Sequence, residues 1–124
     1  MNVVDSSGWL EYFADGENAG FFAPAIEDIE NLIVPVINIY EVFKRILQSQ
    51  GLEVAEVRIA ELYKGLQVDL TTPLALSAAQ ISVSYHLPLA DSQLLATARA
   101  YDATLWTQDE HFEAIPGVKY IAKK

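Results

Sequence analysis

The chain has 124 residues, 52% of them apolar, and no cysteine, which excludes disulfides, thiolate nucleophiles and cysteine-ligated metal sites. This length and apolar content suffice for one continuous core, so we expect a single domain over residues 1–124 and exclude a disordered chain. Its 17 Asp and Glu against 8 Lys and Arg leave a formal net charge of −9, which excludes nucleic-acid binding through a generally basic surface, because phosphate contacts depend on Lys and Arg.

Short apolar runs alternate along the chain with longer segments that have helical spacing. The predicted strands cover residues 1–4, 32–34, 67–70, 103–106 and 118–121. This alternation predicts an α/β fold in which helices cover both faces of a short, mostly parallel sheet, as in a doubly wound domain. No apolar run approaches the ~20 residues of a membrane span, and the first residues lack a secretory signal pattern. We therefore expect a cytoplasmic protein without membrane contact.

Caps, stop residues and apolar spacing mark the predicted helices. Six are predicted, from residue 6 or 7 to 13, and over residues 18–29, 36–50, 54–62, 72–85 and 88–98. Ser6 or Ser7 caps the first, and Pro24 makes the second imperfect. Thr72 followed by Pro73 predicts the start of the fifth. The third helix is supported by an apolar stripe at Val36, Tyr40, Phe43 and Leu47.

In this topology, four acidic residues are expected at the same edge of the sheet. Asp5 follows the first predicted strand and Asp109 follows the fourth, while Glu41 and Asp91 lie near the starts of two helices. Ligand crevices in open parallel sheets lie outside the carboxyl ends of the strands. Four carboxylates repel one another in a partly desolvated cleft, so divalent cations are needed to neutralise them. A site made only of oxygen ligands favours Mg²⁺ or Mn²⁺.

Each acid also has a structural alternative, and the residues alone leave both interpretations open. Asp5 could cap the helix that follows it, and Asp91 could stabilise a helix N-terminus through the helix dipole. Glu41 could form a surface ion pair with a cation three or four residues further along its helix. Asp109 could be a turn residue that hydrogen-bonds the backbone.

Longer motifs in this sequence resemble those of a known family. The run PLAD at residues 88–91, with ATA at 96–98, and the run TQDEHF at 107–112 resemble the C-terminal signature of PIN-domain ribonucleases. The likeness is strongest to the VapC-type toxins of type II toxin–antitoxin pairs. The segment DSS after the first apolar run and the segment IYEV at 39–42 are similar to the family's first and second acidic positions, so the resemblance covers the whole chain.

The resemblance implies a three-layer α/β/α PIN-like domain that acts as a Mg²⁺- or Mn²⁺-dependent endoribonuclease. Such an enzyme hydrolyses RNA phosphodiesters with a carboxylate-bound metal and a water nucleophile. It also implies a cognate VapB-like, DNA-binding antitoxin and a homodimer. The matching positions are Asp5, Glu41, Asp91 and Asp109 as catalytic acids and metal ligands, and Ser6 and Thr107 as hydroxyls beside them that help to bind the cofactor.

Several residues near these motifs have open roles. Gln108 stands where many relatives have a basic residue, which leaves its part in substrate contact undecided. His111 either faces the cleft or, the interpretation we favour, is a loop residue that positions Phe112. We do not expect Arg99 to contact RNA. The aromatic residues between positions 9 and 29 are expected mainly in the core, although in the VapC-type family this region helps to form a groove for the antitoxin.

Two other functions compete with a nuclease. A phospho-receiver signalling domain has a similar length and clustered acids, but it requires an acidic pair after the first strand, where Asp5 is followed by Ser6. A PIN-like binding module without activity is the second alternative, and the presence of all four acids argues against it.

Overall fold

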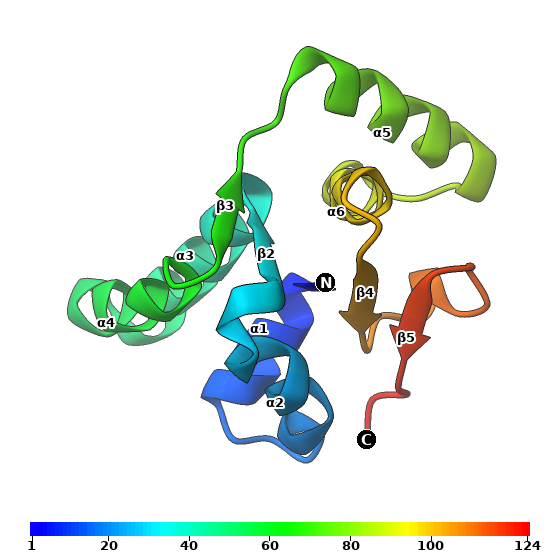
Figure 1. Cartoon of the computed structure of the whole chain (residues 1–124). Coiled ribbons are helices and arrows are strands. Elements are labelled where there is room, and N and C mark those ends of the chain that lie inside the picture. Colours follow the sequence, from blue (N-terminus) through cyan, green and yellow to red (C-terminus); the bar gives the residue numbers. More distant parts are fainter.

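The computed structural model describes all 124 residues and confirms an α/β fold with six α-helices and five strands (Figure 1). The strands form one sheet of order β3-β2-β1-β4-β5, in which every neighbouring pair is parallel. In chain order the elements are β1 (Asn2–Val4), α1 (Ser6–Phe13), α2 (Ala19–Glu27), η1 (Ile29–Asn31), β2 (Leu32–Pro35), α3 (Val36–Gln50), α4 (Leu52–Leu62), β3 (Leu66–Val68), α5 (Thr72–Tyr85), α6 (Leu89–Ala100), β4 (Thr104–Thr107), η2 (Glu110–Phe112) and β5 (Val118–Tyr120).

The central strands are buried on both faces, which gives the predicted three-layer arrangement. Successive strand residues point to opposite faces, and Val3 and Val4 of β1 are both fully buried. Val3 packs with Ile33 in a core that also contains residues of α5 and α6. Val4 packs with Val34 in a second core, which is completed by α1, α2, α3 and α4. The apolar runs of β1 and β2 are continuous because both faces of these central strands are covered.

The start of α1 differs from the prediction. The helix begins at Ser6, and neither Ser6 nor Ser7 caps it. Ser6 Oγ donates a hydrogen bond of 2.7 Å to Glu41 Oε1, and Ser7 Oγ donates one of 2.9 Å to Asp5 Oδ2. Both hydroxyls therefore bind acidic side chains instead of the first turn of the helix.

Two other helix boundaries shift by small amounts. Helix α5 is capped by Thr71, one residue before the predicted cap, and the Thr71 side chain accepts from the backbone N–H of Leu74. The predicted helix over residues 18–29 is shorter, because α2 ends at Glu27 and η1 follows it. Pro24 lies inside α2 without ending it.

Helices α3 and α4 form a hairpin joined by Gly51, whose φ of 90° lies in the region that favours glycine. Three of the four residues in the apolar stripe predicted for α3 are exposed, among them Tyr40 at 60% and Leu47 at 41%, whereas Phe43 packs partly against the core. The buried residues of α3 are Asn38, Val42 and Ile46. Helix α3 thus carries one apolar side toward the core and a second toward solvent.

The aromatic residues between positions 9 and 29 pack in the core. Trp9 and Phe22 are fully buried, and the ring of Phe21 lies 5.3 Å from that of Trp106. Tyr12 is less buried, and its hydroxyl donates to Glu27. The prediction of core packing is confirmed for this segment, and the largely apolar groove of the molecule lies elsewhere, between α3 and α4.

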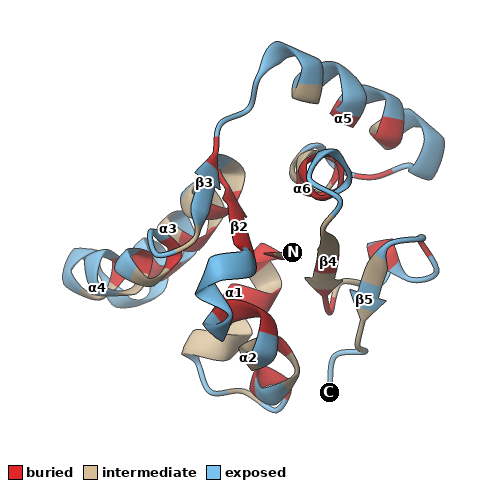
Figure 2. Ribbon diagram, in the orientation of Figure 1, coloured by how far each residue is buried: buried red, intermediate tan, exposed pale blue.

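Helix α5 lies on the far side of α6 from the strands (Figure 1). Figure 2 shows that most of its surface is exposed, and Val83 on this helix is 77% exposed. None of the helices combines the length and the apolarity that crossing a bilayer requires.

Candidate active site

The four predicted acids line one cleft of about 460 Å³. Asp5 follows β1 and Asp109 lies just beyond β4, and these neighbouring parallel strands end at the same edge of the sheet. Glu41 lies in the second turn of α3 and Asp91 in the first turn of α6. The structure therefore brings together carboxylates from four separate segments. The cleft is completed by Ser6, Ser7, Leu10, Tyr40, Lys44, Arg45 and Gln48.

Asp5 is held by side chains and does not cap α1. Its carboxylate accepts hydrogen bonds from Thr107 Oγ1 at 2.8 Å and from Ser7 Oγ at 2.9 Å, and it makes no cap bond to the helix. Burial raises the pKa of Asp5, the two hydroxyl bonds lower it, and the charges of Asp109 and Glu41 raise it further. The capping alternative for Asp5 is therefore wrong. Its raised pKa means that burial and the neighbouring acids disfavour its ionised form, which a bound cation would stabilise.

Thr107 connects two of the acids. It is fully buried, donates its hydroxyl proton to Asp5 and accepts the backbone N–H of Asp109 at 2.9 Å. Both hydrogen-bonding capacities of one hydroxyl are thus used to set the relative positions of Asp5 and Asp109. The sequence identified this hydroxyl through the family motif, and the structure shows its two partners.

Glu41 is positioned from within the fold. Ser6 Oγ donates to Glu41 and accepts from Asn38 Nδ2 at 3.0 Å. Asn38 is fully buried, and its Oδ1 atom has no partner. Neither Lys44 nor Arg45 forms an ion pair with Glu41, so the surface-pair alternative is wrong. Asn38 was missed by the sequence analysis, although an amide one turn before Glu41 in an otherwise apolar stretch is a usable signal.

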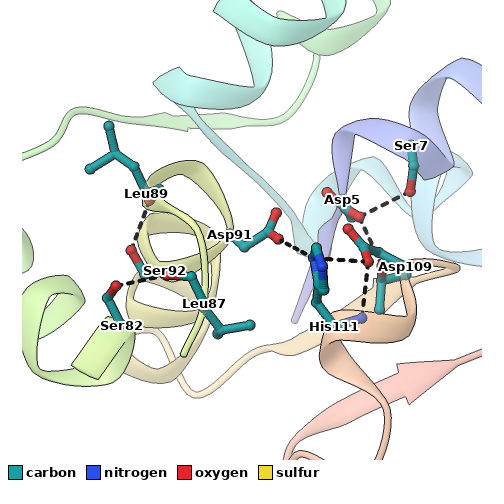
Figure 3. A network of polar contacts seen from close by, with 10 residues as sticks. Asp5, Ser7, Ser82, Leu87, Leu89, Asp91, Ser92, Asp109 and His111 are labelled. Atoms are coloured by element: carbon teal, nitrogen blue, oxygen red, sulfur yellow. Dashed lines mark hydrogen bonds and ion pairs between the residues drawn. The ribbon is translucent and has the colours of Figure 1, made fainter. Parts of the chain in front are cut away.

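His111 is not among the residues that line the cleft, but its ring contacts two carboxylates that do, so it does more than position Phe112. Its Nδ1 atom lies 3.4 Å from Asp91 Oδ2 and 3.2 Å from Asp109 Oδ1, with the ring between the two carboxylates (Figure 3). Phe112, the next residue, is fully buried. Asp109 also accepts the backbone N–H of His111 at 2.9 Å, so its alternative role as a turn residue is real and coexists with its place in the cleft.

Unbalanced negative charge is the main electrostatic property of the site. Burial, followed by the charges of Asp5 and Asp109, raises the pKa of Asp91 to about 6, against a smaller lowering by His111. One ligand atom from each of Asp91, Asp109 and His111 lies within 4.8 Å of the others. This close group includes neither Asp5 nor Glu41. Two carboxylates that repel one another beside an imidazole nitrogen fit a divalent cation, which would neutralise them.

Gln108 does not take part in the cleft. It is buried, its Oε1 accepts from Asn18 Nδ2 at 2.9 Å, and its Nε2 donates to the backbone oxygen of Ser7 at 3.4 Å. This side chain ties the loop before α2 to the end of β4. A role for Gln108 in substrate contact is therefore not supported by its position.

The positive charge at the cleft comes from one helix. Lys44 and Arg45 of α3 line the cleft and have exposed side chains without acidic partners, and Lys44 Nζ lies 5.5 Å from the ring centre of Tyr40. Arg99 is on the last turn of α6 and donates to Tyr85 Oη at 3.2 Å. It does not line the cleft, in agreement with the expectation that it is not an RNA contact.

A second depression of about 500 Å³ adjoins the cleft and has the opposite character. It is lined almost entirely by apolar side chains of α3 and α4, and we call it the α3–α4 groove. Tyr40 and Lys44 line both the groove and the cleft. The groove residues are Ile39, Tyr40, Phe43, Lys44, Leu47, Ile59 and Tyr63.

Comparison with known proteins identifies the fold. The family model for the PIN domain matches residues 3–118. The chain belongs to the PIN domain family. Among curated proteins, none matches this sequence.

Solved structures share this PIN fold over nearly their whole length. A toxin–antitoxin complex from Klebsiella pneumoniae contains a chain with 20% identity and a TM-score of 0.78, with 96% of each chain covered. VapC20 of Mycobacterium tuberculosis, a toxin that cleaves the sarcin–ricin loop, has 16% identity and a TM-score of 0.77, covering 95% of this chain and 97% of that one. DNA-bound VapBC from Salmonella typhimurium has 15% identity and a TM-score of 0.75, covering 98% and 97%.

Proposed function

We propose that this PIN domain is a Mg²⁺- or Mn²⁺-dependent endoribonuclease and the VapC-type toxin of a toxin–antitoxin pair. The observation that carries the proposal is the convergence of Asp5, Glu41, Asp91 and Asp109 on one cleft at the carboxyl edge of the sheet. The similar structures include toxin–antitoxin complexes and a toxin that cleaves RNA, which supports the same class of function.

The residues of the cleft divide the work of phosphodiester hydrolysis. Asp5, Asp91 and Asp109 would hold the ion, and Glu41 would face it from α3, which forms one wall of the cleft. When bound, the divalent ion supplies an activated water and neutralises charge on the phosphoryl group. Thr107 and Ser6 keep Asp5 and Glu41 oriented by hydrogen bonds of 2.8 and 2.7 Å, so the carboxylates need little rearrangement.

The positions of the cations favour approach of the RNA along α3. Lys44 and Arg45 are the cations that line the cleft, and both are exposed and unpaired. Phosphate groups are attracted to such side chains, whereas the opposite side of the cleft is acidic. Tyr40 is 60% exposed beside Lys44 and offers an aromatic face on which a base of single-stranded RNA can stack. These residues would give RNA a local binding surface, although the chain as a whole has a net charge of −9.

The antitoxin is proposed to occupy the α3–α4 groove. Phe43 and Leu47 leave apolar surface exposed there, and an apolar face of a partner helix or strand would bury it. Since Tyr40 and Lys44 also line the cleft, a segment that continues from the groove reaches the acidic site directly. An Arg or Lys of that segment would pair with the carboxylates and replace the ion. We take the antitoxin to be VapB-like and DNA-binding.

A homodimer is proposed through α5. This helix packs on α6 and presents Leu76 and Val83 to solvent at 62% and 77% exposure, and Leu89 at the start of α6 is equally open. A second copy facing the same helices would bury these apolar side chains.

The proposal is tested by cleavage of RNA with the purified protein, in Mn²⁺ or Mg²⁺ and with EDTA. We expect Asp5→Asn to reduce cleavage on the order of a hundredfold or more, because the variant loses a buried ligand charge. Asp69→Asn is the matched control, since Asp69 is an exposed acid outside the cleft. Equal cleavage by Asp5→Asn, or cleavage that persists in EDTA, would contradict the proposal, and no cleavage by any form would favour the inactive binding module.

A further inference from the structure

The proposed ion site contains a nitrogen atom that a site of four acids does not have. Nδ1 of His111 lies 3.4 Å from Asp91 Oδ2 and 3.2 Å from Asp109 Oδ1, and one ligand atom from each of the three residues fits within 4.8 Å. Adjacent ligands of a six-coordinate ion with bonds of about 2.1 Å are about 3.0 Å apart, and opposite ligands about 4.2 Å. The two distances from Nδ1 therefore fall within the range of spacings between ligands that share one ion.

The backbone holds the His111 ring at this place. Asp109 accepts the backbone N–H of His111, and its own N–H is bonded to the buried hydroxyl of Thr107. The next residue, Phe112, is fully buried in the core that contains α6. The turn from Thr107 to Phe112 is thus fixed at both ends, and from this turn the His111 ring points toward Asp91 (Figure 3).

The imidazole is also accessible to an ion from solution. The side chain of His111 is 54% exposed, whereas that of Asp91 is 14% exposed. Nδ1 has only these two carboxylates as partners, and the ring makes no other hydrogen bond within the protein. A cation that enters the cleft can therefore take the position between the carboxylates without breaking any contact of the ring with the core.

We propose that His111 is a ligand of the bound ion and gives the site a preference for Mn²⁺ and other first-row transition ions over Mg²⁺. This inference rests on the metal site of the proposed function and adds the identity of the ion. Mg²⁺ is a hard ion that takes oxygen ligands and keeps its water, whereas transition ions accept imidazole nitrogen. A set of carboxylates with one imidazole therefore favours transition ions over Mg²⁺ more strongly than four carboxylates do.

The test measures metal binding to the full chain, without RNA. Isothermal titration with Mn²⁺ and with Mg²⁺ at pH 7.5 compares the wild type with His111→Asn and with His86→Asn. His86 is the matched control because it is the other histidine of the chain, is exposed, and has a left-handed backbone conformation that Asn accepts. Pulsed electron paramagnetic resonance of bound Mn²⁺ then detects coupling to a ligand ¹⁴N nucleus directly.

We expect His111→Asn to weaken Mn²⁺ binding about tenfold and Mg²⁺ binding by less than about twofold. The ¹⁴N coupling should be present in the wild type and in His86→Asn and absent from His111→Asn. Absence of the coupling in the wild type, which needs no variant to fold, overturns the inference. Equal weakening of both ions also overturns it, because His111 then only orients the carboxylates. A protein that binds Mn²⁺ through His111 but cleaves no RNA contradicts the proposed function alone.

Discussion

The acidic cleft and the α3–α4 groove are neighbours of similar size, yet they are built in opposite ways. The cleft takes its four carboxylates from the residue after β1, from α3, from α6 and from the turn after β4, so it exists only when these distant segments have come together. The groove takes its lining from two helices that are consecutive in the chain and joined at Gly51. One depression is made of repelling charges and the other of exposed apolar side chains.

The cleft and the groove would each gain from a bound partner, for different physical reasons. Like charges in a half-buried cleft disfavour the folded state, and a cation removes this cost. Exposed apolar side chains contribute favourable free energy only when a second surface covers them and removes them from water. Tyr40 and Lys44 line both depressions, so an antitoxin bound in the groove, as proposed, would lie beside the cleft.

The largest effect is expected from a charge placed in the groove. Leu47→Glu should weaken binding of the proposed antitoxin by about a hundredfold, because a carboxylate would be buried against an apolar partner. Binding is measured by titration of the purified partner. Gln50→Glu, with the same charge change at the end of α3 and outside the groove, is the control and should bind normally. Unchanged binding of Leu47→Glu would place the antitoxin elsewhere.

A smaller effect is expected from one hydroxyl that supports the cleft. Thr107→Val should lower the free energy of unfolding by about 2 kcal/mol, since Asp5 loses a donor and the N–H of Asp109 loses its acceptor. Urea denaturation measures this change. Thr97→Val is the comparison, because Thr97 is equally buried but donates to a helix carbonyl at Gln93 and should lose much less. Similar losses in both variants would show that Thr107 has no special part in the site.

The smallest effect tests the charge repulsion itself. The pKa of Asp91 is about 6 in the folded protein, above its ordinary value of 3.8, so the folded state holds this proton more tightly than the unfolded chain. Stability should therefore fall as the pH rises from about 4 to 6. In EDTA at pH 7.5, Asp91→Asn should be more stable than the wild type by about 1 kcal/mol, after allowance for screening by solvent, and near pH 4 the difference should vanish.

Thermal unfolding at several pH values measures this dependence. Asp69→Asn, at an exposed acid outside the cleft, should show no comparable gain. A loss of stability in Asp91→Asn at pH 7.5 would mean that the free cleft is not strained by its charge.

The limits of sequence-based prediction are clearest on α3. The stripe of Val36, Tyr40, Phe43 and Leu47 correctly predicts a helix, but its period is equally compatible with a core face or an exposed one. Only packing shows that most of the stripe lies outside. In the same way, Ser6 and Ser7 have the pattern of helix caps, but each hydroxyl donates to a carboxylate instead. Ser6 binds Glu41, which is distant in sequence, and Ser7 binds Asp5, which lies just before the helix.

By itself the sequence determined the alternation of strands and helices, the parallel sheet and the four acids, because these depend on local periodicity and on the rule that strand ends share one edge. It did not determine the direction of the His111 ring, the buried support from Asn38 or the exposed side of α3. Those features depend on contacts between segments far apart in the chain, such as His111 with Asp91 and Ser6 with Glu41. Their geometry exists only after the layers have packed, so the tertiary structure decided which donors and acceptors face the cleft.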